Sequence, residues 1–148
     1  MAKPSFRILR AAYDQLLTEY PDHMPCDGGW DNQCAIRMSI VLNQEKTVKI
    51  NKETYSEPKC SHGHARGAES LANFLVTKIG YPKVYKDPAA AKITIAEQTG
   101  ILFFKDCFQR TGETTARGDH IDLWDRGLTM TYDDPGNKAK QLWFWQLP

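Results

Sequence analysis

The stretch that decides the fold runs from Gly28 to Asn43 and reads GGWDNQCAIRMSIVLN. It opens with two glycines, continues through the short polar residues Asp31 and Asn32, which can cap a helix, and then becomes apolar with Cys34 at its opening. Apolar side chains in this run fall on more than one line of the helical surface, which is typical of a buried helix. The stretch therefore predicts a central helix that carries Cys34 in its first turn.

A cysteine in the first turn of a helix has a favourable setting for a nucleophile. The first backbone N–H groups of a helix lack acceptors from a preceding turn, and the helix dipole places positive charge there. Both effects favour the thiolate form of Cys34, and papain-like enzymes place their nucleophile in this way. The alternative is a structural cysteine, because free cysteines are often buried and inert.

Length and composition are those of one soluble globular domain. The chain has 148 residues, of which 41% are hydrophobic and 25% are charged, so we expect a single domain over residues 1–148. A formal net charge of +1 gives no reason to expect a nucleic acid as partner. The N-terminus lacks the apolar core of a signal peptide, and no stretch is long enough for membrane insertion. We therefore expect synthesis in the cytoplasm without a signal peptide.

The other cysteines do not suggest a disulfide scaffold or a metal site. One disulfide among Cys26, Cys60 and Cys107 fits an oxidising compartment, and the sequence does not choose the pair. Cys60 also begins a C-x-H-x-H cluster with His62 and His64. Its spacing matches none of the usual structural zinc patterns, and a second pair of ligands is not evident nearby. We therefore expect solvated loop residues here, with no metal and no cofactor.

Helices are expected in the first two thirds of the chain. Apolar residues at helical spacing predict helices over residues 5–20, 34–43 and 67–79. Between the last two, residues 44–67 are polar and without periodicity, which indicates a long surface excursion. Residues 87–99 fit a short helix, although the middle of this segment also fits a strand.

Strands are expected in the last third. Residues 101–108 and 142–147 are apolar runs typical of buried strands, and residues 109–118 have the composition of a loop. Residues 119–125 and 128–133 alternate around a short glycine turn, which is typical of a hairpin. This order predicts an α+β fold, with N-terminal helices packed against a C-terminal antiparallel sheet.

A thiol nucleophile needs a base, and His120 is the histidine best placed for that role. His23, His62 and His64 lie in expected loops, whereas His120 lies early in an expected strand. The base in turn needs an acceptor on its second ring nitrogen. The alternative is a strand histidine that is hydrogen-bonded locally and has no catalytic role.

The hairpin register suggests which residue accepts from the imidazole. A two-residue turn at 126–127 places His120 opposite Asp133, and directly paired residues point to the same face of a sheet. A longer turn would shift this register, which leaves Asp134 and Asp122 as alternatives. Asp122 lies two residues from His120 and shares its face.

The segments QCAIRMSIVLN, GDHIDLW and LWFWQLP together resemble the amidase effectors of the type VI secretion system, family four. These are NlpC-type papain-like cell-wall peptidases. The resemblance spans most of the chain and is looser over residues 44–67 and 109–117. Carried over residue by residue, Cys34 matches the family nucleophile and His120 its base, and Asp133 is the best match to the acidic third member.

The resemblance implies a papain-like NlpC-type fold and an injected antibacterial toxin. Such a cysteine amidase would cut the γ-D-glutamyl–meso-diaminopimelate bond of peptidoglycan stem peptides in the periplasm of a rival Gram-negative cell. Its implied partners are peptidoglycan peptides, a cognate immunity protein that plugs the cleft, and components of the secretion apparatus. Trp30, Asp31 and Arg37 are candidates for substrate binding because they lie close to Cys34 in the sequence, although Arg37 fits a structural ion pair equally well.

Two other classes of function stay open at this point. The first is a papain-like amide hydrolase or acyltransferase with another substrate, because a fold and a triad do not define a substrate. The second is a non-catalytic cell-wall-binding domain in which Cys34 belongs to the core. The sequence also leaves open the oligomeric state and the preferred length and cross-linking of the stem peptide.

Overall fold

The computed structural model describes residues 2–20, 33–108, 118–131 and 138–148. The chain divides into two compact units, residues 1–80 and 81–148, and each is described by itself. Helices make up the regular structure of the first unit, and the second unit contains a short helix and an antiparallel sheet. No helix within the described ranges has both the length and the apolar character needed to cross a membrane.

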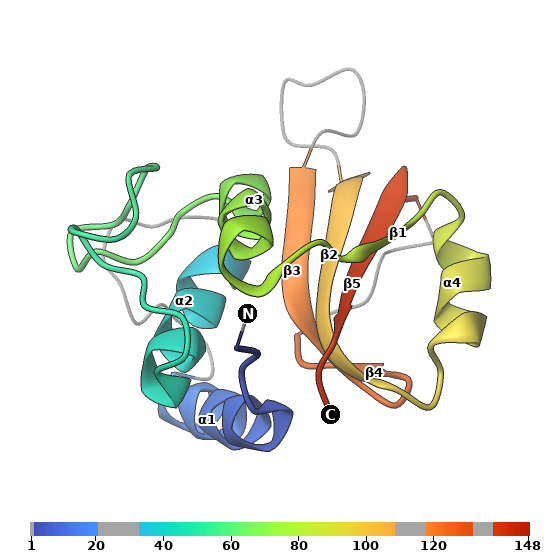
Figure 1. The fold of residues 1–148 in the computed structure, drawn as a ribbon, viewed down its shortest axis with the longest axis horizontal. Helices are drawn as coiled ribbons and strands as arrows, with labels where there is room; N and C mark the ends of the chain where they lie inside the picture. The colour runs from blue at the N-terminus through green and yellow to red at the C-terminus, as the bar shows by residue number, and fades with distance from the viewer. Residues whose placement is uncertain (1, 21–32, 109–117, 132–137) are drawn as a thin grey trace. The chain divides into compact units, whose positions relative to one another are not determined.

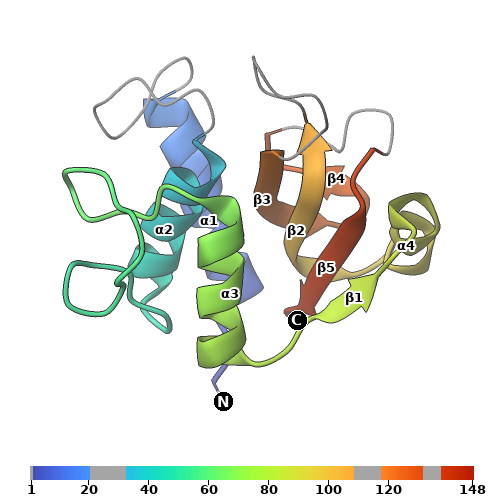
Figure 2. The ribbon, with the colours of Figure 1, turned by 90° about the horizontal axis from the view of Figure 1, so that it is seen from above.

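The first unit contains the three long helices that the sequence predicts. They are α1 (Phe6–Glu19), α2 (Cys34–Glu45) and α3 (Ala68–Ile79), and α1 packs against α2 (Figure 2). Helix α1 begins where predicted, because the Ser5 side chain accepts a hydrogen bond from the backbone N–H of Ile8.

A carboxylate at the end of α2 holds the start of α1. Glu45 accepts hydrogen bonds from the backbone N–H groups of Ser5 and Thr47, each at 2.9 Å. Burial alone would raise the pKa of Glu45, but these hydrogen bonds stabilise its charged form and lower the pKa overall.

The segment between α2 and α3 differs from the prediction of a polar surface excursion. Val48, Ile50 and Tyr55 are each no more than 2% exposed, so part of this segment belongs to the core of the first unit. Their burial was not predictable from periodicity, because they are isolated apolar residues among polar ones. Tyr55 also packs edge-on against Phe74 of α3, with ring centroids 5.0 Å apart.

Two polar side chains of α2 hold this segment in place. The Asn43 amide donates to the carbonyl of Ile50 at 2.9 Å and accepts from its N–H at 2.7 Å. The Ser39 hydroxyl accepts from the N–H of Ala65 at 3.0 Å and donates to the carbonyl of Ala35 at 2.8 Å. Because Ser39 and Asn43 are one helical turn apart, one face of α2 binds the segment at two points.

The second unit contains a five-stranded antiparallel sheet with the order β1-β5-β2-β3-β4 (Figure 1). The strands are β1 (Lys83–Tyr85), β2 (Thr99–Phe108), β3 (Gly118–Asp125), β4 (Leu128–Thr129) and β5 (Gln141–Gln146). The sequence predicts β2, β3 and β5 closely. It does not predict β1, which is short and contains two exposed residues.

A short helix, α4 (Pro88–Thr94), packs on the sheet. Asp87 caps it by accepting from the N–H of Ala90 at 3.2 Å, so the helical interpretation of this segment is confirmed and the strand interpretation is wrong. Helix α4 and the turn after it share a core with β2, β3 and β5. Its buried members are Ala91, Ile95, Leu102, Phe104, Cys107, Trp124, Ala139, Leu142 and Phe144.

The predicted two-residue turn between β3 and β4 is confirmed. Arg126 and Gly127 have φ angles of 46° and 100°, so both central residues adopt the positive φ of a type I′ turn. Asp125 pairs with Leu128 and Trp124 pairs with Thr129. The second arm is shorter than expected, because β4 ends at Thr129.

Gly100 lies in the central strand β2, and its backbone pairs with Trp124 on one side and Gln146 on the other. A Cβ atom at this position would clash with the backbone carbonyl of Trp145 and with the Phe144 ring.

We therefore expect Gly100→Ala to lower the free energy of unfolding by on the order of 3 kcal/mol, because the neighbouring strand must move to admit the methyl group. Chemical denaturation followed by circular dichroism measures this change. Gly67→Ala is the matched control, because its nearest contact would be Ser70 Oγ at an ordinary 3.5 Å. Equal stability of the two variants would contradict the close packing at Gly100.

Candidate active site

Cys34 is the first residue of α2, as the sequence predicts. Gln33 is the N-cap, and the backbone N–H of Arg37 closes the first helical turn onto the Gln33 carbonyl at 3.0 Å. Cys34 is 3% exposed and is not part of a disulfide, so it retains its thiol. It therefore lies among the N-terminal amide groups of a helix, where positive electrostatic potential is greatest.

The three candidates for substrate binding are located as follows. Arg37 lies one turn beyond Cys34 on α2 and is partly exposed. Trp30 and Asp31 lie outside the described residues, so their predicted roles stay predictions.

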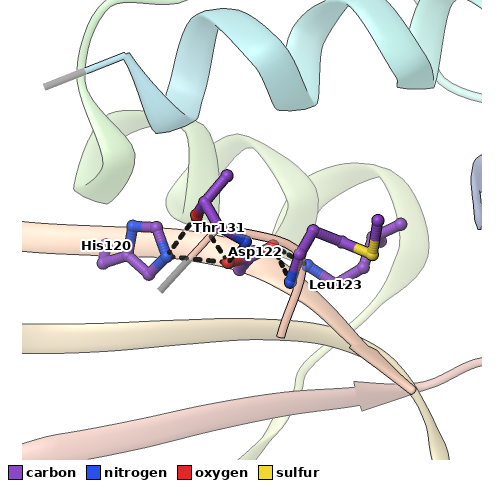
Figure 3. Close-up of polar contacts among 5 residues, drawn as sticks. His120, Asp122, Leu123 and Thr131 are labelled. Atoms are coloured by element: carbon purple, nitrogen blue, oxygen red, sulfur yellow. Dashed lines mark hydrogen bonds and ion pairs between the residues drawn. The ribbon is translucent and has the colours of Figure 1, made fainter. Parts of the chain in front are cut away.

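His120 lies in β3, and its side chain is completely buried. Its ring is nearly parallel to that of Phe104, its direct partner on β2, with an angle of 9° and centroids 6.2 Å apart. On one edge of the ring, Nε2 lies 2.9 Å from Oδ2 of Asp122, whose side chain is also completely buried (Figure 3). The structure thus joins His120 to one of the two alternative aspartates.

The Asp122 carboxylate accepts hydrogen bonds from several directions. Oδ1 accepts from the backbone N–H groups of Leu123 at 2.8 Å and Met130 at 3.1 Å. Oδ2 accepts from Thr131 twice, from its N–H at 3.1 Å and from its hydroxyl at 2.8 Å, in addition to its contact with His120. Because a carboxylate has about four lone-pair sites, this set of donors satisfies it without water.

The prediction that Asp133 lies opposite His120 requires β4 to extend to residue 133, but β4 ends at Thr129. The β3–β4 ladder stops at Thr129, and the next two N–H groups turn to the Asp122 carboxylate. Asp133 and Asp134 themselves lie outside the described residues. The role of Asp133 therefore stays a prediction, and Asp122 is the aspartate seen in contact with His120.

A β-bulge interrupts the β2–β3 ladder next to His120. Pairing is regular up to Phe104 opposite His120 and resumes at Phe108 opposite Gly118. Within the bulge, Asp106 has a φ of 55°, and its N–H donates to Oδ1 of Asp119 at 2.8 Å. Bulges of this kind are common beside active sites, where they redirect a side chain.

The C-x-H-x-H cluster has a different structural setting from the expected one. Cys60 is disulfide-bonded and buried, so its sulfur is not a thiolate ligand. Cys107 is not part of a disulfide, and Cys26 lies outside the described residues. His64 is partly buried with Nδ1 3.7 Å from the Cys60 sulfur, and burial together with neighbouring His62 lowers its pKa. Among the described residues, no group of three His, Cys, Asp or Glu side chains is arranged to hold a metal ion.

The candidate catalytic residues belong to different units of the chain. Cys34 belongs to the helical unit, and the His120–Asp122 pair belongs to the sheet of the other unit. A helix-terminal thiol and a carboxylate-bound imidazole are the parts that acyl transfer by a cysteine enzyme requires.

Comparisons with known proteins identify the family of this chain. A family described as "Type VI secretion system (T6SS), amidase effector protein 4", or Tae4, matches residues 30–145. No curated protein sequence matches the chain significantly.

Solved structures of Tae4 proteins have the same fold. The effector Tae4 from Salmonella typhimurium, in complex with the immunity protein Tai4 from Enterobacter cloacae, is 22% identical, with a TM-score of 0.69 over 99% of this chain and 100% of that chain. Tae4 from Enterobacter cloacae is 19% identical, with a TM-score of 0.72 over 99% and 98% of the two chains. Tae4 from Salmonella Typhimurium, in a Tae4–Tai4 complex, is 21% identical, with a TM-score of 0.73 over 99% of this chain and 100% of that chain.

The predicted α+β fold is confirmed by these structures, and a papain-like NlpC-type fold is consistent with them. The family resemblance that the sequence motifs indicate is confirmed by the profile match, which spans most of the chain. The chain therefore belongs to the Tae4 family of type VI secretion system amidase effectors.

Proposed function

We propose that this amidase effector hydrolyses peptidoglycan stem peptides at the γ-D-glutamyl–meso-diaminopimelate bond by cysteine catalysis. The observation that carries the proposal is the buried His120–Asp122 pair, with 2.9 Å between Nε2 and Oδ2, in a chain in which Cys34 begins a helix and retains its thiol. The family match supports amide hydrolysis, and the choice of bond rests on the resemblance of the sequence motifs.

In the proposed mechanism, Cys34 is the nucleophile and His120 is the general base. Asp122 holds the proton of the neutral imidazole on Nε2, which leaves Nδ1 to take the thiol proton. The thiolate attacks the amide carbonyl, and first-turn N–H groups of α2 stabilise the oxyanion. Nδ1 then gives its proton to the leaving amine as the thioester forms. A water molecule, deprotonated by the same nitrogen, hydrolyses the thioester and restores the thiol.

The acidic third member is proposed to be Asp122, because it accepts from His120 within the same strand. Asp133 is the position that matches the family motif best, and it is the competing candidate. Trp30, Asp31 and Arg37 are proposed to contact substrate, since each lies close to Cys34 in the sequence.

Delivery and partners follow from the family. We propose that type VI secretion delivers the protein to the periplasm of a rival Gram-negative cell, and that a cognate immunity protein protects the producing cell. Structures of two Tae4 proteins in complex with Tai4 support the second proposal. The disulfide of Cys60 supports the first, because disulfides persist in oxidising compartments such as the periplasm.

The first test is a digest of diaminopimelate-type peptidoglycan analysed by mass spectrometry. Wild-type protein is expected to release fragments that end at D-glutamate, and Cys34→Ala and His120→Ala are expected to release none, because each lacks a reacting group. Cys107→Ala and His62→Ala are matched controls, since Cys107 is a second buried cysteine outside a disulfide and His62 is an exposed histidine. Intact muropeptides with folded wild-type protein would contradict the proposed substrate, and cleavage by Cys34→Ala would contradict the proposed nucleophile.

A second test distinguishes the two aspartates. Asp122→Asn is expected to lower kcat by on the order of 10³-fold or more, because an amide can donate to Nε2 and favour the wrong tautomer of His120. Asp133→Asn is expected to lower kcat by less than about threefold. Steady-state kinetics on a purified stem peptide measures both, with circular dichroism to confirm folding. The opposite ranking would assign the role to Asp133.

A third test addresses the site of action. Wild-type protein that carries a periplasmic leader is expected to lyse a Gram-negative host, because the peptidoglycan substrate lies in that compartment. The same protein without a leader, and Cys34→Ala with the leader, are expected to be harmless. Growth curves and microscopy of lysis measure the effect. Normal growth with folded wild-type protein in the periplasm would overturn the toxin proposal.

A further inference from the structure

We propose that Thr131 is a positioning residue for the amidase reaction, because its hydroxyl bridges His120 and Asp122. The inference rests on the proposed function, in which His120 is the base. The Thr131 Oγ1 atom lies 2.8 Å from Oδ2 of Asp122 and 3.3 Å from Nε2 of His120, and those two atoms are 2.9 Å apart (Figure 3). Three polar atoms from three residues thus form a closed triangle.

The hydrogen atoms available to this triangle determine how it is bonded. A carboxylate only accepts, so the single hydroxyl hydrogen of Thr131 is best used toward Oδ2 of Asp122. The hydroxyl lone pairs then face Nε2 of His120, and so does Oδ2. Two acceptors around one ring nitrogen require that nitrogen to carry hydrogen. Thr131 therefore strengthens the tautomer in which Nε2 is protonated and Nδ1 carries the lone pair that accepts the reaction proton.

The backbone of Thr131 contributes to the same arrangement. Its N–H donates to Oδ2 of Asp122 at 3.1 Å, and the preceding N–H, of Met130, donates to Oδ1 at 3.1 Å. These bonds fix both oxygens of the carboxylate and hold the main chain of Thr131 beside the imidazole. The hydroxyl then needs only one rotamer to reach both partners, and the β-branched side chain of threonine restricts χ1 to few rotamers.

The position of Thr131 follows from the turn of the hairpin. The two-residue turn at Arg126 and Gly127 pairs Thr129 with Trp124, and the chain then leaves the ladder toward Asp122. In a ladder that continued in register, one of the two N–H groups after Thr129 would pair with the backbone of β3 and the other would point away from it. In this protein these groups bind a side chain instead, and the hydroxyl is brought to the imidazole as a result.

The test compares Thr131→Val and Thr131→Ser with wild type on a purified stem peptide. Valine keeps the shape and removes the hydroxyl, so kcat is expected to fall about tenfold while KM stays within about twofold. Serine keeps the hydroxyl and is expected to restore most of kcat. Thr129→Val is the matched control, because Thr129 is the same residue type two positions earlier in β4, and it is expected to match wild type.

Nuclear magnetic resonance of the His120 ring supplies a readout that does not need turnover. In wild type, Nε2 is expected to carry hydrogen and Nδ1 to be unprotonated in the neutral ring, and Thr131→Val is expected to shift the Nε2–H resonance because one of its two acceptors is lost. The proposal would be overturned if Thr131→Val had the kcat of wild type and an unchanged Nε2–H resonance. It would also be overturned if the kcat of Thr131→Ser were no higher than that of Thr131→Val. If wild type itself cleaves no peptidoglycan, the proposed function fails, and the resonance shift still decides whether Thr131 positions His120.

Discussion

A completely buried carboxylate, that of Asp122, is the constraint on which the setting of His120 depends. Removing a carboxylate from water is costly unless its oxygens find donors within the protein. Asp122 finds them in the hairpin that follows it, in the N–H groups of Leu123, Met130 and Thr131 and in the Thr131 hydroxyl. The same satisfied carboxylate then orients His120. Hydrogen bonds to the Asp122 carboxylate therefore determine the path of the hairpin together with strand pairing.

Much of the fold could be predicted because local signals agreed with the tertiary structure. Ser5 before an apolar periodicity predicted the start of α1, and the run after Cys34 predicted a buried helix. The Arg126-Gly127 pair between alternating arms predicted a hairpin turn, and the structure shows that this turn is of type I′. Family membership was predictable from three short motifs, and with it the amidase activity that the profile match confirms.

The rest depended on long-range partners that sequence patterns do not encode. The burial of Val48 and Ile50 depends on Ser39 and Asn43, which bind their segment from a neighbouring helix. The choice between Asp122 and Asp133 assumed that the ladder would continue beyond Thr129. It ends there because a carboxylate two strand positions from His120 competes successfully for the next N–H groups. A register argument cannot foresee this competition, because side-chain acceptors are not part of it.

The two edges of the sheet share a property that bears on how the protein behaves at high concentration. One edge strand, β1, has three residues and the other, β4, has two, whereas the central strand β2 has ten. An edge strand of ordinary length offers a row of unpaired N–H and C=O groups on which another chain can add a strand, and this is a common start of aggregation. The strands β1 and β4 are too short to offer a long template of this kind. Because the hairpin ends early to bind Asp122, the edge strand β4 itself offers only two residues for intermolecular β-pairing.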